Sequence, residues 1–249
     1  MENTNRFSNR VKDYVKYRPG YPAEMIDFFA SGINDNNSII ADIGAGTGIL
    51  TGLLLQKGFT VIAVEPNKEM REKYRELLAG YTNVSFVDGT AETTKLAKGS
   101  IDVIVAAQAF HWFDRHKTKA EFKRILKPGG TVALIWNERL VLSAFETEYE
   151  KLITLYSTDY TRVDYRNITD EEIEDFFTPG EVKLTIFENY QQFHFEGLKG
   201  RLQSSSYIPV PGDENYTGMM EALQQLFNRY EQNGVIRINY STKVYTGKM

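Results

Sequence analysis

The fold is decided by residues 41–48, which read Ala41-Asp42-Ile43-Gly44-Ala45-Gly46-Thr47-Gly48. The run Ile39–Ile43 has the length and β-branched content of a buried strand, and a helical pattern begins at about Gly48. Glycines between a strand and a helix let the backbone turn sharply and approach a ligand. The helix N-terminus offers unpaired N–H groups to polar ligand atoms. We therefore expect a ligand-binding turn here, with a plain tight turn as the alternative.

Outward from this turn, strand-length apolar runs alternate with helical patterns as far as Trp136. We expect strands at 39–43, 60–64, 84–87, 101–106 and 131–136, and helices at about 48–56, 68–78 and 117–126. Strands that alternate with helices form βαβ units around a parallel sheet. Because such crossovers are right-handed, the prediction is an open, doubly wound α/β sheet.

The alternation stops after Glu138. We expect helices at 142–156, from the capping box at Thr169 to about 178, at 198–205 and at 218–233, and strands at 182–187, 191–195 and 235–245. The prediction is a single domain over 1–249. Its core would be about 35–139 with strands at about 182–195 and 235–247, and its helical cap would be about 1–30, 140–180 and 198–234.

Composition excludes several classes of function. The 249 residues are 42% apolar and 25% charged, which is typical of a globular protein. A net charge of -4 argues against a nucleic-acid partner. The chain has no cysteine, so thiolate catalysis and Cys-ligated metals are excluded, and its three scattered histidines indicate no metal site. With no signal-like or membrane-length apolar run, we expect a cytoplasmic protein without a membrane partner.

An acid ends the second predicted strand. Glu65 follows Val61–Val64 and lies 21 residues after Gly44, close to the spacing at which an acid meets ribose hydroxyls. The alternative is a surface acid at the start of a loop. Dinucleotide-binding folds share this arrangement, but their fingerprint has a third glycine where this chain has Ile49, which argues against NAD.

Together these features resemble the class I S-adenosylmethionine-dependent methyltransferases over about residues 38–137. The glycine pattern of 42–48 resembles their first motif, and Glu65 resembles their ribose-binding acid. Residues 88–92, Asp-Gly-Thr-Ala-Glu, resemble the segment that closes over adenine. Residues 126–130, Leu-Lys-Pro-Gly-Gly, resemble the turn before their fifth strand.

Two further segments suggest a subgroup. Residues 17–22, Tyr-Arg-Pro-Gly-Tyr-Pro, and 107–114, Ala-Gln-Ala-Phe-His-Trp-Phe-Asp, are similar to the type 11 methyltransferases akin to trans-aconitate methyltransferase. The resemblance implies a Rossmann-like, mostly parallel seven-stranded sheet and S-adenosyl-L-methionine as the cofactor. It also implies a small molecule as the methyl acceptor.

The resemblance assigns cofactor-binding roles along the predicted core. Asp42 would orient the glycine loop and the methionyl ammonium, Glu65 would take the ribose hydroxyls, and Gln108 would lie beside the sulfonium. The methionine moiety would be lined by Gly44, Ala45 and Gly46.

The adenine end is assigned in the same way. Pro66 and Ala91 would pack on the ring, with the Ala91 N–H near a ring nitrogen. Many relatives carry an acid for the adenine amino group, whereas this chain has Thr90. That contact could pass to a backbone carbonyl, a hydroxyl or Glu92.

Catalysis would be an in-line displacement in which the cofactor supplies the electrophile. The candidate catalytic residues are Gln108 and His111. We expect His111 to act as a general base, to donate a hydrogen bond to the substrate or to pack at a helix start. Candidate substrate residues are Tyr14, Arg18, Trp112, Trp136 and Tyr207. Arg18 and Arg201 could bind a carboxylate or form structural ion pairs.

The main prediction is therefore a small-molecule methyltransferase, acting as a monomer or homodimer. An NAD(P)-dependent Rossmann oxidoreductase and a non-catalytic S-adenosylmethionine-binding protein are the alternatives. A methyltransferase of macromolecules is less favoured because no basic tract with interleaved aromatic residues occurs.

Overall fold

The computed structural model describes residues 16–33, 37–158, 160 and 168–249. Its centre is a seven-stranded sheet of order β3-β2-β1-β4-β5-β7-β6. The strands β1 to β5 pair in parallel, and β7 pairs antiparallel with β5 and β6. Their bounds are β1 Ile39–Ile43, β2 Thr60–Val64, β3 Val84–Val87, β4 Ile101–Ala107, β5 Leu126–Arg139, β6 Val182–Phe193 and β7 Ile236–Gly247. The predicted mostly parallel α/β sheet is confirmed.

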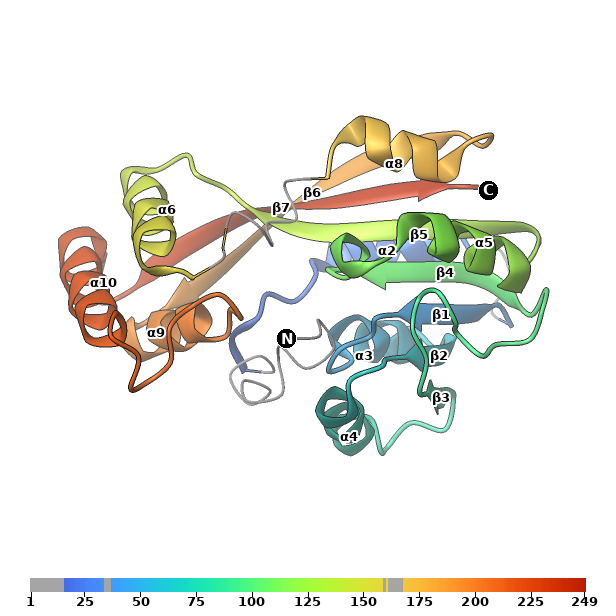
Figure 1. Cartoon of the computed structure of the whole chain (residues 1–249), viewed down its shortest axis with the longest axis horizontal. Helices are drawn as coiled ribbons and strands as arrows, with labels where there is room; N and C mark the ends of the chain where they lie inside the picture. Colours follow the sequence, from blue (N-terminus) through green and yellow to red (C-terminus); the bar gives the residue numbers. More distant parts are fainter. Residues whose placement is uncertain (1–15, 34–36, 159, 161–167) are drawn as a thin grey trace.

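The helices form two groups (Figure 1). One group lies along the sheet, and the other surrounds the far ends of β5, β6 and β7. The first group is α2 Ala23–Ser31, α3 Ile49–Gln56, α4 Lys68–Leu77, α5 Arg115–Ile125 and α8 Asp170–Phe177. The second group, the cap, is α6 Ala144–Tyr156, α9 Phe195–Gln203 and α10 Tyr216–Tyr230. A 3₁₀ helix, η2 Phe110–Trp112, follows β4.

Three long strands carry the cap. β5 has 14 residues, and β6 and β7 have 12 each. The sequence predicts two strands at 182–187 and 191–195, and this prediction is wrong because β6 is continuous. Its middle pairs with β7 through Asn189 opposite Tyr240 and Tyr190 opposite Asn239. The polar residues in the middle of β6 lie on an edge strand of the sheet, where polar side chains can face solvent.

The sheet is covered on both faces. One apolar cluster joins α2 and α3 to β1, β2 and β4, and includes Phe29, Leu54 and Val103. The other joins α5 and α8 to the opposite face, and includes Phe122 and Phe177. The sequence assigns 1–30 and 140–180 to the cap. The structure corrects this assignment for α2 and α8, because their apolar stripes pack on the sheet.

The cap has a core of its own. Side chains of α6, α9 and α10 pack on the extended ends of β6 and β7, including Phe193, Ile238 and Tyr240. The strands therefore continue from the central sheet into the cap without a linker. This continuity fixes where the cap stands over the carboxyl ends of β4 and β5.

Helix α8 begins as the sequence predicts. The Thr169 side chain accepts a hydrogen bond from the Glu172 N–H, and the Glu172 carboxylate accepts one from the Thr169 N–H. This reciprocal pair satisfies two of the free donors at the helix start. The predicted capping box is confirmed.

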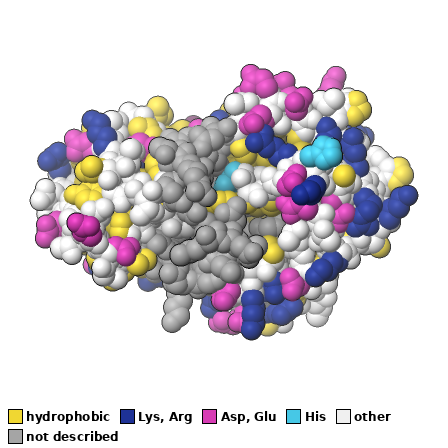
Figure 2. Space-filling model, viewed as in Figure 1, with side chains coloured by type: hydrophobic (Ala, Val, Ile, Leu, Met, Phe, Trp, Pro, Cys, Tyr) yellow, Lys and Arg dark blue, Asp and Glu magenta, His cyan; other side chains and the backbone are white. Residues whose placement is uncertain are grey.

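The surface mixes charges of both signs. In the view of Figure 2, basic and acidic side chains alternate over α4 and α5. Several are paired, such as Lys73 with Glu76 and Lys117 with Asp114. Within the described ranges, no helix combines the length and the apolarity needed to cross a bilayer.

We predict that Phe122→Ala lowers the free energy of unfolding by about 3–5 kcal/mol. Phe122 is fully buried between α5 and the sheet and meets Phe176 edge to face at 5.8 Å. Chemical denaturation followed by circular dichroism measures the change. The control is Leu155→Ala, because Leu155 is 73% exposed and should change the value by less than about 0.5 kcal/mol. A loss below about 1 kcal/mol for Phe122→Ala would contradict this packing.

Candidate active site

The glycine loop adopts backbone conformations that favour glycine. Gly44, Gly46 and Gly48 have φ of 72°, 59° and 83°. A Cβ on Gly44 would also lie 2.7 Å from the Ala109 Cβ, closer than carbon atoms approach. The loop therefore runs directly under the segment that follows β4. The predicted sharp turn between β1 and α3 is confirmed.

Glu65 holds this loop in place. Its Oε2 accepts a hydrogen bond from the Gly46 N–H at 2.9 Å, and its Oε1 accepts one from the Asn67 N–H at 2.9 Å. The side chain is 7% exposed, and burial raises the pKa of the carboxyl. Each carboxylate oxygen keeps a second lone pair that can accept from a ligand. The acid at the end of β2 thus joins two neighbouring βα turns.

Glu65 faces a cavity at the carboxyl ends of β1, β2 and β4, which we call the Glu65 cavity. It is bounded by the glycine loop, the start of α4 and the segment after β3. Its lining residues are Gly44, Gly46, Glu65, Pro66, Asn67, Met70, Thr90, Ala91, Glu92, Gln108, Ala109, Trp112 and Phe113.

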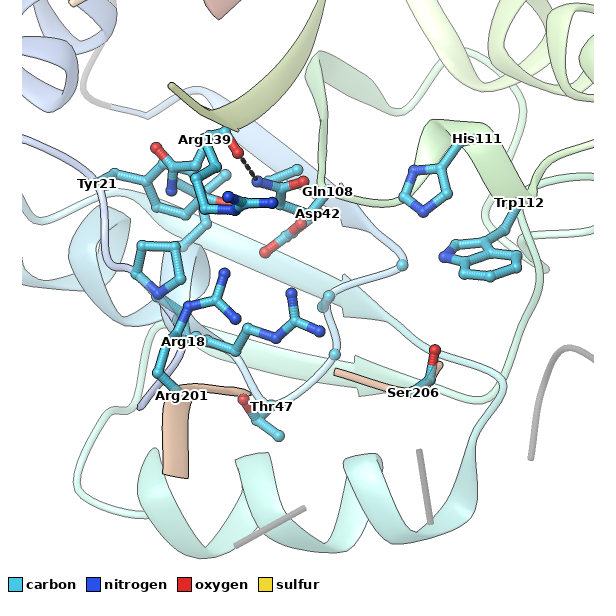
Figure 3. Close-up of a pocket in the computed structure, with 18 of the residues that line it drawn as sticks. Arg18, Tyr21, Asp42, Thr47, Gln108, His111, Trp112, Arg139, Arg201 and Ser206 are labelled. Atoms are coloured by element: carbon cyan, nitrogen blue, oxygen red, sulfur yellow. Dashed lines mark hydrogen bonds between the residues drawn. The ribbon is translucent and has the colours of Figure 1, made fainter. Parts of the chain in front are cut away.

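A second cavity, the arginine cavity, is lined by residues of the glycine loop and of the cap, and Figure 3 draws residues that line it. Its lining residues are Arg18, Pro19, Tyr21, Asp42, Gly44, Ala45, Gly46, Thr47, Ile49, Leu50, Ala107, Gln108, His111, Trp112, Asn137, Arg139, Tyr160, Arg201, Ser206 and Tyr207. The two cavities share four residues, Gly44, Gly46, Gln108 and Trp112. They therefore form one groove along the carboxyl edge of the sheet, where open α/β sheets bind ligands.

Asp42 is a buried acid at the floor of the arginine cavity. Its Oδ2 accepts a hydrogen bond from the Thr51 hydroxyl at 2.6 Å. Its Oδ1 is buried and has no hydrogen-bond partner among the described residues. Burial raises the pKa of this carboxyl to about 7. A buried carboxylate with a free oxygen favours a cation in the space beside it.

Gln108 stands where the two cavities meet. It has φ of 54°, a conformation that costs free energy for a residue with a side chain. Its backbone N–H donates to the Ile135 carbonyl, and its Nε2 donates to the Asn137 carbonyl at 3.2 Å, the bond drawn in Figure 3. Its Oε1 has no hydrogen bond to any described residue. The Gln108 residue at this strained turn therefore lines both cavities.

His111 belongs to η2 and lies half-buried at the wall of the arginine cavity. Burial and the positive charge of Arg18 lower the pKa of its imidazole to about 3. The ring is therefore neutral at physiological pH and only weakly basic. This environment argues against the expected general-base role and leaves the hydrogen-bonding role open.

The structure brings most of the predicted site residues together. Those lining one or both cavities are Asp42, Gly44, Ala45, Gly46, Glu65, Pro66, Thr90, Ala91, Glu92, Gln108, His111, Trp112, Arg18 and Tyr207. Tyr14 lies outside the described residues.

The expectation that Trp136 lines the substrate pocket is corrected. Trp136 is 4% exposed on the opposite face of the sheet, where its ring meets Phe110 and Tyr245 edge to face. Successive side chains of a strand point to opposite faces. Its neighbour Asn137 therefore lines the cavity instead.

Sequence analysis missed several lining residues. In the Glu65 cavity these are Asn67, Met70, Ala109 and Phe113, and in the arginine cavity they include Asn137, Arg139, Tyr160 and Ser206. Asn137 and Arg139 lie at the carboxyl end of β5, and this position was a signal that could have identified them. Tyr160 and Ser206 come from the cap, and no motif marked them.

The residues present fit S-adenosylmethionine. Glu65 can accept from a ribose diol, and the free Asp42 Oδ1 suits an ammonium. Within the described ranges, no cluster of three His, Cys, Asp or Glu side chains could hold a metal ion.

Residues 41–134 match the family model of a methyltransferase domain. An uncharacterized methyltransferase of Mycobacterium tuberculosis (strain ATCC 25618 / H37Rv) is 39% identical over 133 residues, which cover 53% of this chain and 52% of the relative. The chain thus spans about half the length of this curated relative. Residues 41–134, which include the glycine loop and Glu65, are thus similar to a methyltransferase domain.

Two solved structures share the fold. One is a protein of Anaeromyxobacter dehalogenans that is provisionally named a type II methyltransferase. It is 21% identical with a TM-score of 0.70, and covers 93% of this chain and 98% of its own. The other is phosphoethanolamine N-methyltransferase 2 of Haemonchus contortus in complex with S-adenosylhomocysteine. It is 16% identical with a TM-score of 0.59, and covers 99% of this chain and 58% of its own. These two likenesses show that the fold is shared.

We predict that Gly44→Ala costs about 1–3 kcal/mol more stability than Gly58→Ala. Both glycines have positive φ, 72° and 88°, so both changes carry the same kind of backbone strain. Only Gly44 has a neighbour within 4 Å of the added Cβ, and Gly58 has none. Urea denaturation of the two variants measures the difference. Equal losses would show that the loop does not pack under Ala109 as described.

Proposed function

We propose that this protein is an S-adenosylmethionine-dependent methyltransferase that transfers a methyl group to a small molecule by in-line displacement. The observation that carries the proposal is the groove itself. A buried Glu65 that clamps Gly46 stands at one end, and the free oxygen of Asp42 lies on the other side of the same loop. This arrangement would place the nucleoside of a ligand on the Glu65 side of the loop and its amino-acid part on the Asp42 side.

In this proposal the cofactor lies across the glycine loop. Its ribose would meet Glu65, and its methionyl ammonium would meet Asp42. The loop backbone at Gly44, Ala45 and Gly46 would line the methionine chain. The Gln108 Oε1 would lie near the sulfonium, because a neutral amide oxygen tolerates a positive charge without competing as a strong nucleophile.

The adenine would occupy the outer part of the Glu65 cavity. Pro66 and Ala91 would pack against the ring, and Met70 and Phe113 extend that apolar surface. Glu92 already accepts a hydrogen bond from the Asp114 N–H at 2.9 Å. The Thr90 hydroxyl also accepts one, from the Thr93 N–H at 3.2 Å. Both side chains keep lone pairs, so the adenine amino group would donate to the Thr90 hydroxyl, to Glu92 or to a backbone carbonyl.

The bound cofactor would supply the electrophilic methyl group. The protein would align the acceptor and exclude water, and alignment can contribute up to roughly 7–11 kcal/mol of barrier lowering. Trp112 borders both cavities and would separate the methyl group from solvent. His111, neutral in its half-buried position, would hydrogen-bond the acceptor without taking its proton.

The acceptor would enter the arginine cavity, between the cap and Gln108. This cavity is lined by Tyr207, Trp112 and three arginines. These residue types suit a small polar molecule with an apolar part. Membership of the type 11 subgroup similar to trans-aconitate methyltransferase stays a prediction from residues 17–22 and 107–114.

We predict that Glu65→Gln weakens S-adenosylhomocysteine binding about 10- to 150-fold, because one charge-assisted hydrogen bond contributes about 1.5–3 kcal/mol. Isothermal titration calorimetry measures the dissociation constant. Glu72→Gln, on the exposed side of α4, should leave it unchanged. Titration of the wild type with NAD should give no heat of binding. Tight NAD binding without S-adenosylhomocysteine binding would overturn the proposal in favour of an oxidoreductase.

The proposed ammonium site also predicts a pH dependence. The pKa of Asp42 is about 7 without ligand, and an ammonium binds only the ionised carboxylate. Affinity for S-adenosylhomocysteine should therefore fall as pH drops from 8 to 6, approaching tenfold per unit below 7. Asp42→Asn should flatten this dependence, whereas Asp27→Asn, at an exposed position of α2, should preserve it. A wild-type affinity that is constant over this range would contradict the assignment of Asp42.

A further inference from the structure

Arg201 is a buried cation whose described contacts are all neutral. It belongs to α9 and is 8% exposed. Its Nε donates to the Tyr240 hydroxyl at 3.1 Å, and its Nη1 donates to the Ser205 hydroxyl at 3.3 Å. Among the described residues its Nη2 has no hydrogen-bond partner and no acid forms an ion pair with the guanidinium. The side chain lines the arginine cavity, into which it points (Figure 3).

Arg139, another arginine of the cavity, differs from Arg201 because it forms an ion pair with Glu150 and also donates to the Tyr160 hydroxyl. Arg18 donates to the Ser204 carbonyl and lies near enough to His111 to lower the pKa of the imidazole. Buried charges are normally paired because desolvation penalises an isolated ion. Among the described residues no acid pairs with Arg201, so its positive charge is one that a ligand could neutralise.

Neighbouring residues fix the direction of this guanidinium. The Tyr240 hydroxyl that accepts from Arg201 donates in turn to the Gln191 Oε1 at 2.9 Å. The Gln191 Nε2 donates to the Tyr17 carbonyl at 3.1 Å. A cation held by such a chain loses little side-chain entropy when it binds an anion. The arrangement is typical of a prepared binding group.

The position of Arg201 assigns it to the acceptor more readily than to the cofactor. Arg201 belongs to α9 of the cap, and its guanidinium lies over the ring of Tyr240 at 6.0 Å. Tyr240 itself belongs to the apolar core of the cap. S-adenosylmethionine carries a sulfonium, an ammonium and one carboxylate, so its binding would add net positive charge. An anionic second ligand would then balance the cavity.

We propose that the methyl acceptor is an organic anion whose carboxylate or phosphate group pairs with Arg201. The aromatic rings of Tyr207 and Trp112 would flank its carbon skeleton. This proposal rests on the proposed methyltransferase function, because it requires the cofactor to occupy the glycine-loop side of the groove.

Calorimetry on the full chain saturated with S-adenosylhomocysteine tests the proposal. The probes are butyrate, benzoate and 3-phenylpropionate, each compared with its amide, and phenyl phosphate compared with phenol. At least one anion should bind tenfold or more tightly than its neutral counterpart. Arg201→Gln should weaken that anion about 30-fold or more, since removing one partner of a buried charge pair has effects of this size. Arg201→Lys should retain part of the preference.

The controls separate the two proposals. Arg201→Gln should change S-adenosylhomocysteine affinity by less than threefold, and Arg237→Gln, an exposed arginine of β7, should change neither affinity. If Arg201→Gln does not fold, the wild-type comparison of anions with neutral counterparts still decides. Equal binding of both kinds of probe, or loss of S-adenosylhomocysteine instead of the anion, would overturn the anion site. Failure of the wild type to bind S-adenosylhomocysteine would overturn the methyltransferase function itself.

Discussion

The structure depends on the hydrogen bonds between the Glu65 carboxylate and the backbone of two neighbouring turns. By accepting from Gly46 and Asn67, this acid joins the carboxyl ends of β1 and β2. The bonds are charge-assisted and buried, so they hold the loop more firmly than neutral contacts would. Because the glycine loop separates the two cavities, its position sets the shape of both. A single carboxylate thus organises the carboxyl edge of the sheet.

Acidic and basic side chains with little exposure to solvent line the groove at the carboxyl edge of the sheet. Asp42 is held by one hydroxyl, His111 is neutral, and Arg201 has neutral hydrogen-bond partners. Burial penalises the charged form of a group that has no partner of opposite charge. Groups of this kind are concentrated at binding sites. The proposed cofactor, with its separated charges, and an anionic acceptor would supply the partners that these groups lack.

The sequence predicted the central fold well. The periodicity of residues 38–136 located β1 to β4 within one residue at each end, because buried parallel strands are short apolar runs with clear boundaries. The cap was less predictable. The alternation of apolar and polar residues in β6 is interrupted at Glu188-Asn189 and at Gln191-Gln192, so the continuity of the strand depends on pairing with β7 that no local pattern reveals.

The residues of the candidate site divide in the same way, because those on the central sheet were predictable and those from the cap were not. Asp42, Glu65 and Gln108 belong to motifs or strand ends, and the sequence identified them. Tyr160 lies far along the chain from these motifs and reaches the cavity only because the cap folds over β5. Successive side chains of a strand point to opposite faces of the sheet, and this alternation places Trp136 on the face away from the cavity. A sequence motif does not show which face a residue occupies.

A crystal structure with S-adenosylhomocysteine would test the central claim most directly. Our account requires both ribose hydroxyls within hydrogen-bond distance of the Glu65 carboxylate and the ligand ammonium within hydrogen-bond distance of the Asp42 Oδ1. A ligand bound elsewhere, or one whose ribose points away from Glu65 while the carboxylate contacts only the Gly46 and Asn67 backbone, would contradict it.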